Sequence, residues 1–126
     1  MTQPEPYIYQ ATLLRVIDAD TLDCDLDLGF GVWLRKQRVR FRGIDTPESR
    51  TRNRAEKALG LAAKVRCQEL MGESGDKFLL RTFLEKGKFG RILGEPLVGD
   101  GTSVGEILVS EGHARIYFGG KKTPWT

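Results

Sequence analysis

Histidine and cysteine are scarce in this chain. Its 126 residues include one histidine and two cysteines. His113 alone cannot build a histidine-based metal centre, and it leaves little basis for a histidine-activated nucleophile. Cys24 and Cys67 lack CxxC spacing and have no neighbouring cysteine or histidine that would complete a zinc site. Each cysteine falls among apolar positions, so we expect two buried free thiols.

Long apolar runs are also missing. No stretch approaches the roughly 20 residues that cross a membrane, and residues 1–6 lack the basic start and apolar run of a secretion signal. We therefore expect a cytoplasmic protein without a membrane partner. The net charge is only +3, but arginines cluster between positions 35 and 54. This local positive charge favours a polyanionic partner.

The chain length and the hydrophobic pattern predict one α+β domain, built on a small curled sheet or barrel. Residues 21–28 alternate strictly between polar and apolar side chains, with acidic residues at 23, 25 and 27, which is typical of a half-buried strand. Further strands are expected at 7–17, 32–44, 77–85, 91–98 and 113–118, with helices at 54–71 and 104–111. The domain would span residues 1–126, with a core at about 7–118 and an irregular tail at 119–126.

Acidic residues follow two of the expected strands. Asp20 lies in the turn after the first strand, and Asp45 ends the third, so both can meet at one rim. Two carboxylates and a backbone carbonyl suit a hard cation such as Ca²⁺ or Mg²⁺. Pro47 would stiffen the turn and direct Thr46 and Glu48, and Glu48 could then take a proton from water. The alternative is that such aspartates only cap turns.

Arginines and aromatic residues accompany these carboxylates. Arg40 and Arg91 can offset negative charge on a phosphate, because a guanidinium binds phosphate oxygens in pairs. Phe89, with Tyr117 or Phe118, can stack on nucleic-acid bases. The alternatives are a solvated cationic strand face for the arginines and core packing for the aromatic residues.

Three motifs occur together in a fixed order. They are Asp18-x-Asp20-Thr21, then Arg40 five residues before Asp45-Thr46-Pro47-Glu48, then Lys88-Phe89-Gly90-Arg91. A short helix at 104–111 and Gly112-x-Ala114 follow. In this order and spacing, the chain resembles the staphylococcal nuclease (thermonuclease) family over residues 10–118. The resemblance implies a five-stranded OB-fold barrel with two helices, and we expect the family's long C-terminal helix to be absent or very short here. We expect the tail to fold back instead, with Trp125 covering apolar surface.

The same resemblance implies a calcium-dependent endonuclease that hydrolyses DNA, RNA or both with little sequence specificity. Calcium would be held by Asp20, Asp45 and the Thr46 carbonyl. Glu48 would activate the attacking water, and Arg40 and Arg91 would bind the scissile phosphate. These three are the expected catalytic residues. The products would carry 3′-phosphate and 5′-hydroxyl ends. Substrate contacts would come from Lys88, Phe89, Tyr117 and Phe118.

Two interpretations remain open at this point. The first is an active nuclease, expected to be a monomer and to be encoded by a phage or another mobile element. The second is a nuclease-like OB module that binds nucleic acid or protein without cutting. A binding-only descendant is expected to lose Asp20, Glu48 or an arginine, whereas all five charged positions are filled here.

Overall fold

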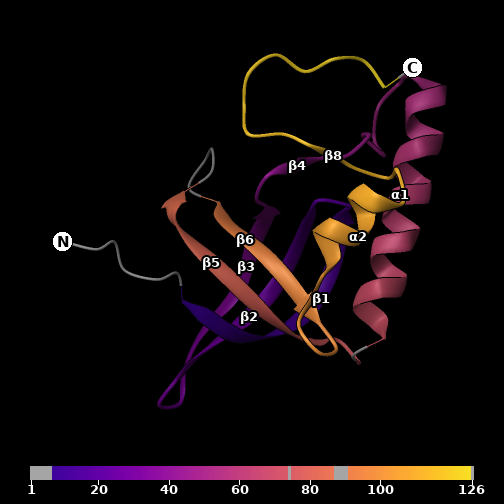
Figure 1. The fold of residues 1–126 in the computed structure, drawn as a ribbon. Helices are drawn as coiled ribbons and strands as arrows, with labels where there is room; N and C mark the ends of the chain where they lie inside the picture. Colours follow the sequence, from indigo (N-terminus) through magenta and orange to yellow (C-terminus); the bar gives the residue numbers. More distant parts are fainter. Residues whose placement is uncertain (1–6, 74, 87–90, 126) are drawn as a thin grey trace.

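The computed structural model describes residues 7–73, 75–86 and 91–125 (Figure 1). The strands are β1 (Ile8–Asp18), β2 (Thr21–Gly29), β3 (Val32–Phe41), β4 (Ile44–Asp45), β5 (Lys77–Lys86), β6 (Ile92–Val98), β7 (Thr102–Ser103) and β8 (Arg115–Ile116). The helices are α1 (Arg54–Gly72) and α2 (Val104–Ser110). Neither helix in these ranges is long and apolar enough to cross a bilayer.

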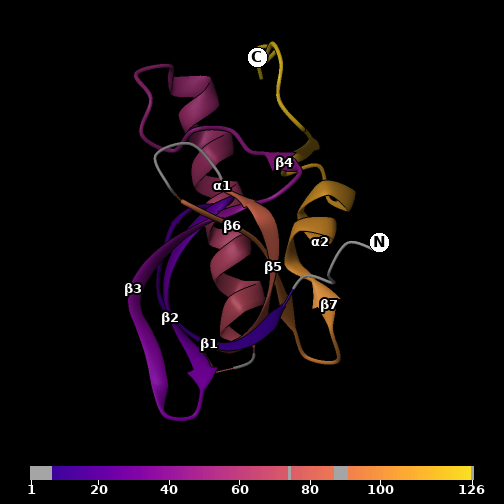
Figure 2. The same ribbon diagram turned by 90° about the vertical axis from the view of Figure 1, so that its left-hand side faces the viewer.

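Five strands close into a barrel. The main sheet has the order β3-β2-β1-β5-β6-β7, and an additional parallel pairing of β3 with β6 joins its two sides. Both helices pack outside this barrel (Figures 1 and 2). The expected five-stranded OB barrel with two helices is thereby confirmed, and the described part of the tail contains no third helix.

The alternation in β2 sorts its side chains as expected. Leu22, Cys24 and Leu26 are buried inside the barrel, whereas the intervening aspartates face outward. A paired hydrogen bond from the Arg38 guanidinium to Asp23 (2.9 and 3.1 Å) lowers the pKa of that carboxyl group. Cys24 and Cys67 are buried free thiols, and desolvation raises the pKa of each to about 12.

The expected strand at 32–44 is wrong in one respect, because it breaks into β3 and β4. Gly43 has φ +82°, which turns the chain away from the barrel. A side chain there would also strike the Phe118 ring, at 2.8 Å from its nearest carbon. After this turn, β4 pairs with β8 instead of with the barrel. The expected strand at 113–118 is shorter too, since only Arg115–Ile116 pair.

Helix α1 supports the segment that follows β4. Asn53 caps the helix by accepting a hydrogen bond from the Glu56 N–H (3.1 Å). Within the helix, Gly60 is buried directly against the backbone of Glu48. A Cβ atom at position 60 would lie 2.5 Å from the Glu48 carbonyl oxygen. The helix can approach this closely only because residue 60 has no side chain.

We predict that Gly60→Ala destabilises the protein by about 1–3 kcal/mol, because the added methyl group overlaps backbone that must then shift. The matched control is Gly72→Ala in the same helix, where an added Cβ meets nothing within 4 Å. That substitution should be neutral or stabilising by up to about 1 kcal/mol. Urea unfolding measures both variants, and equal stability of the two would contradict the tight contact.

A bidentate ion pair joins α1 to the residue that follows α2. Arg66 donates from Nε and Nη2 to the two Glu111 oxygens, at 2.7 and 2.9 Å. This hydrogen bonding lowers the pKa of Glu111 below its usual range. A carboxylate with a lowered folded-state pKa stabilises the fold above its unfolded pKa of about 4.3. That stabilisation is lost as the pH falls through the lowered value.

Glu111→Gln is therefore expected to lower the melting temperature at pH 7. The difference from the unmodified protein should shrink as the pH is lowered below about 4. Glu69→Gln is the control, because Glu69 contacts the same guanidinium through one longer pair of 3.3 Å. Its effect should be smaller. A Glu111→Gln deficit that stays constant from pH 7 to pH 2 would rule out the charge-based origin.

Candidate active site

Six of the residues singled out in the sequence line one pocket of about 310 Å³. Asp20 lies in the turn between β1 and β2, and Arg40 lies near the end of β3. Asp45 ends β4, Thr46 and Glu48 follow it, and Arg91 lies directly before β6. The barrel brings them together because Arg40 is paired with Thr21 of β2 on one side and with Leu93 of β6 on the other. The Phe41 N–H also donates to the Asp20 carbonyl (2.8 Å).

The two aspartates of this pocket are buried and carry cationic partners. Asp20 is 7% exposed and Asp45 is 4% exposed. Arg40 reaches both, with Nη1 3.3 Å from Asp20 Oδ2 and Nη2 3.9 Å from Asp45 Oδ1. Its Nη1 also donates to the Phe41 carbonyl (2.9 Å), which holds the guanidinium in place. Arg40 is thus a half-buried bridge between two carboxylates, not part of a solvated strand face.

Further contacts fix the loop that carries Glu48. The Ser49 hydroxyl donates to Asp18, and Arg50 lies 3.2 Å from the same carboxylate. The Glu48 N–H donates to Glu56 Oε2 in the first turn of α1 (3.0 Å). Asp18 therefore anchors this loop to the turn that holds Asp20. In the sequence, Asp18 was recognised only as part of a motif, and its role in anchoring the loop was not predicted.

Two cations near Asp45 were not expected from the sequence. Lys122 Nζ lies 3.1 Å from Asp45 Oδ1, and Arg115 Nη2 lies 3.5 Å from Asp45 Oδ2. Arg115 comes from β8, which pairs with β4 at Asp45 itself. Lys122 comes from the irregular tail. The β4–β8 pairing positions Arg115, and the path of the tail positions Lys122. No spacing pattern in the sequence indicates that either residue lies at Asp45.

The expected aromatic contacts lie beside this pocket and not within it. Tyr117 and Phe118 line an adjoining hollow of about 630 Å³, which shares Arg40, Arg91 and Lys122 with the pocket. Phe118 is 72% exposed, so it is not a core residue. Tyr117 is half-buried, and its hydroxyl group donates to the Gly120 carbonyl (2.8 Å). Lys88 and Phe89 lie outside the described residues.

The oxygen atoms of this pocket suit a hard cation. Buried carboxylates from Asp20 and Asp45 lie within reach of one guanidinium, and Thr46 lies beside them. Within residues 7–73, 75–86 and 91–125, no three acidic, histidine or cysteine side chains form a metal-binding group. A cation held here would therefore complete its shell with backbone carbonyl, water or substrate oxygens, as Ca²⁺ and Mg²⁺ commonly do.

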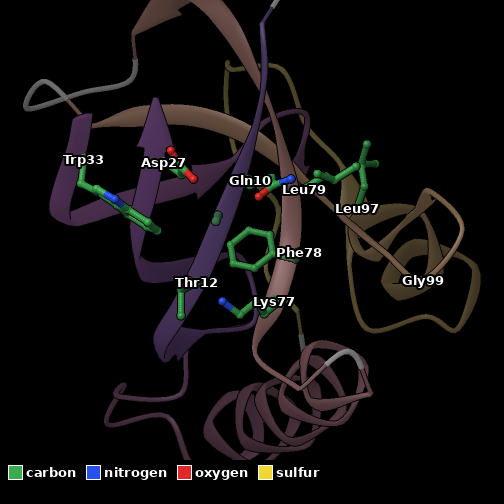
Figure 3. A pocket seen from close by; sticks show the side chains of 10 residues that line it. Gln10, Thr12, Asp27, Trp33, Lys77, Phe78, Leu79, Leu97 and Gly99 are labelled. Carbon is green, nitrogen blue, oxygen red and sulfur yellow. The ribbon is translucent and has the colours of Figure 1, made fainter. Parts of the chain in front are cut away.

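Another hollow, of about 470 Å³, contains none of the expected site residues (Figure 3). Its outer rim is a row of cross-strand neighbours from five strands. They are Trp33, Asp27, Gln10, Leu79 and Leu97. This hollow is larger than the pocket with the two buried aspartates, yet it brings together no comparable set of buried charges. The candidate site is therefore identified by the charged residues that line it and not by its size.

Comparison with known proteins agrees with this geometry. Residues 38–124 match the family model described as staphylococcal nuclease homologue. The chain is 32% identical over 111 residues to Endonuclease YncB of Bacillus subtilis (strain 168), covering 88% of this chain and 49% of that protein. It is 31% identical over 111 residues to the SPbeta prophage-derived endonuclease YokF of the same strain, covering 88% of this chain and 35% of that one.

The chain spans about half the length of the first relative and about a third of the second. The family match covers more than half of the chain and includes Arg40, Asp45, Glu48 and Arg91. Asp20, an expected metal ligand, precedes the matched range, but it lines the same pocket as these four residues. By its sequence and its barrel, the chain belongs to the staphylococcal nuclease homologue family.

Proposed function

We propose that this domain is a calcium-dependent endonuclease that hydrolyses phosphodiester bonds of DNA, RNA or both with little sequence specificity. The observation that carries the proposal is the single pocket that unites two buried aspartates, a glutamate and two arginines. The family and the two relatives named as endonucleases support the same reaction class. A purely structural barrel would gain nothing from gathering these charges.

Arg40 and Arg91 are assigned to the scissile phosphate. Negative charge builds up on the phosphoryl oxygens as a nucleophile attacks phosphorus, and guanidinium groups stabilise that charge through paired hydrogen bonds. Arg40 is prepared for this role because its position is already fixed by Asp20 and by the Phe41 carbonyl. A fixed donor need not reorganise during the reaction.

Glu48 is assigned to the attacking water. Its carboxylate would accept a proton as the water oxygen bonds to phosphorus and the P–O5′ bond breaks, and the departing O5′ would take a proton from solvent water. The products would then be a 3′-phosphate and a 5′-hydroxyl group. The Glu48 backbone is held by Glu56 and by the close contact with Gly60, so the direction of its side chain is supported from the helix.

Asp20, Asp45 and the Thr46 carbonyl would hold the calcium ion. When bound, such an ion would polarise the phosphate and offset part of its negative charge. The carboxylates are suited to this because they are buried, converge on one side of the pocket and offer only oxygen ligands. The gene for this chain is also proposed to derive from a mobile element, because one relative is named as prophage-derived.

The first test is cleavage of supercoiled plasmid and of a single-stranded oligonucleotide, with Ca²⁺ and then with excess chelator. We expect cutting of both substrates only with the cation. The new 5′ ends should accept phosphate from polynucleotide kinase directly, whereas the 3′ ends should block a polymerase until phosphatase treatment. Binding of DNA without any cutting would favour the non-cleaving OB module over the nuclease.

The second test concerns the assigned residues. We expect Arg91→Lys and Glu48→Gln each to lower the cleavage rate by about 10²–10⁴-fold while the circular dichroism spectrum is unchanged. The matched controls are Arg81→Lys, which lies on the outer face of β5 and is paired with Glu95, and Glu69→Gln on α1. Both controls should keep the rate. Full activity in the two site variants would refute these roles.

A further inference from the structure

The tail that follows β8 is anchored across the rim of the candidate site. It arches beyond β4 and β8 and returns toward the first turn of α1 (Figure 1). Arg115 donates to the side chain of Thr123 (2.8 Å) and to its backbone carbonyl, and its guanidinium lies 4.1 Å from the centre of the Trp125 ring. The tail therefore folds back as expected, but the contact found for the Trp125 ring is with the Arg115 guanidinium group and not with apolar surface. These contacts set the position of the residues between.

Lys122 is the tail residue that enters the site. Its ammonium group lies 3.1 Å from Asp45 Oδ1 and 5.1 Å from the centre of the Tyr117 ring. The same side chain lines the pocket with the two buried aspartates and also the adjoining hollow. Lys122 thus stands at the junction between the expected cation ligands and the surface on which a polynucleotide would continue.

Lys122 is also the most easily released of the three cations on Asp45. Its side chain is 52% exposed, compared with 16% for Arg40 and 29% for Arg115. Arg40 is held by Asp20 as well, and Arg115 by Thr123. A long, flexible lysine stem can swing without moving its backbone and would give up one further contact, with the Tyr117 ring, whereas the other two cations would each leave an ion pair or a hydrogen bond behind.

A divalent cation bound at Asp45 would compete with this ammonium group. Both would bind the same carboxylate, and two positive charges at adjoining positions in a buried site repel each other strongly. Loading the cation therefore favours departure of Lys122 from Asp45, because its side chain is more exposed than those of Arg40 and Arg115. A phosphate of the substrate would offer it an anionic partner, because two of the hollows that it lines also contain Arg40 and Arg91.

We propose that Lys122 is a further substrate-binding residue that exchanges partners. It neutralises Asp45 while the cation is absent and contacts a substrate phosphate once the cation is bound. This inference rests on the proposed nuclease function. Lys122 would thereby lower the affinity for the free cation and raise the affinity for the polynucleotide, so cation and substrate would load in a coupled way.

The test compares Lys122→Gln with Lys121→Gln, which removes the same charge from the neighbouring tail position. Calcium affinity is measured by titration calorimetry without nucleic acid. Oligonucleotide affinity is measured by fluorescence anisotropy in calcium over a range of salt concentrations, with Glu48→Gln present in every protein to suppress cutting. Thermal unfolding checks that all the variants are folded.

We expect Lys122→Gln to bind calcium about two- to fivefold more tightly, as suits the loss of one partly exposed ion pair. The slope of log affinity for the single strand against log salt should fall by about 0.7, the value for one lost phosphate contact. Lys121→Gln should change neither quantity. The exchange is overturned if Lys122→Gln matches Lys121→Gln in either measurement, or if the starting protein binds no calcium.

These outcomes are separable from the proposed function. A protein that binds calcium and the oligonucleotide, shows both effects at Lys122 and yet never cuts with Glu48 present would refute the nuclease and leave the exchange standing. A protein that cuts normally, but in which the two lysine variants behave alike, would refute the exchange alone.

Discussion

The Arg40 guanidinium holds the site together by bridging two buried carboxylates. Without it, Asp20 and Asp45 would repel each other in a pocket that excludes much of the surrounding water, and only Asp45 would keep the cationic partners Arg115 and Lys122. The bridge depends in turn on the barrel, because β3 must pair with both β2 and β6 for Arg40 to lie there. The site can therefore form only when the barrel has formed.

Burial separates two arginines of β3 that look alike in sequence. Arg38 and Arg40 both extend from the same strand toward an aspartate near β2. The Arg38–Asp23 pair lies on an open face, with 46% of the arginine side chain exposed, whereas the Arg40 side chain is 16% exposed. An exposed pair is screened by water and contributes little. The half-buried pair is screened less by water, so its electrostatic attraction is stronger.

The sequence predicts features that depend on neighbouring residues better than features that depend on how distant segments of the chain pack together. The alternation in β2 reports burial directly, so its inner and outer faces were predicted correctly. The break at Gly43 was not, because the pattern of apolar residues continues across it and only the backbone turn separates β3 from β4. Motif spacing indicated Asp20, Asp45 and Arg40. Arg115 reaches Asp45 because β8 pairs with β4, and Lys122 reaches it because the tail folds back. Neither contact can be read from the spacing of residues in the sequence.

The pairing of β3 with β6 has a consequence for how the protein is made. Arg91 joins the pocket only when β6 has closed the barrel, and Lys122 joins later still along the chain. A ribosome-bound nascent chain that ends before β6 therefore cannot contain the assembled centre, even if β1, β2 and β3 have already formed a meander. The assembled pocket would thus exist only once synthesis has passed most of the domain.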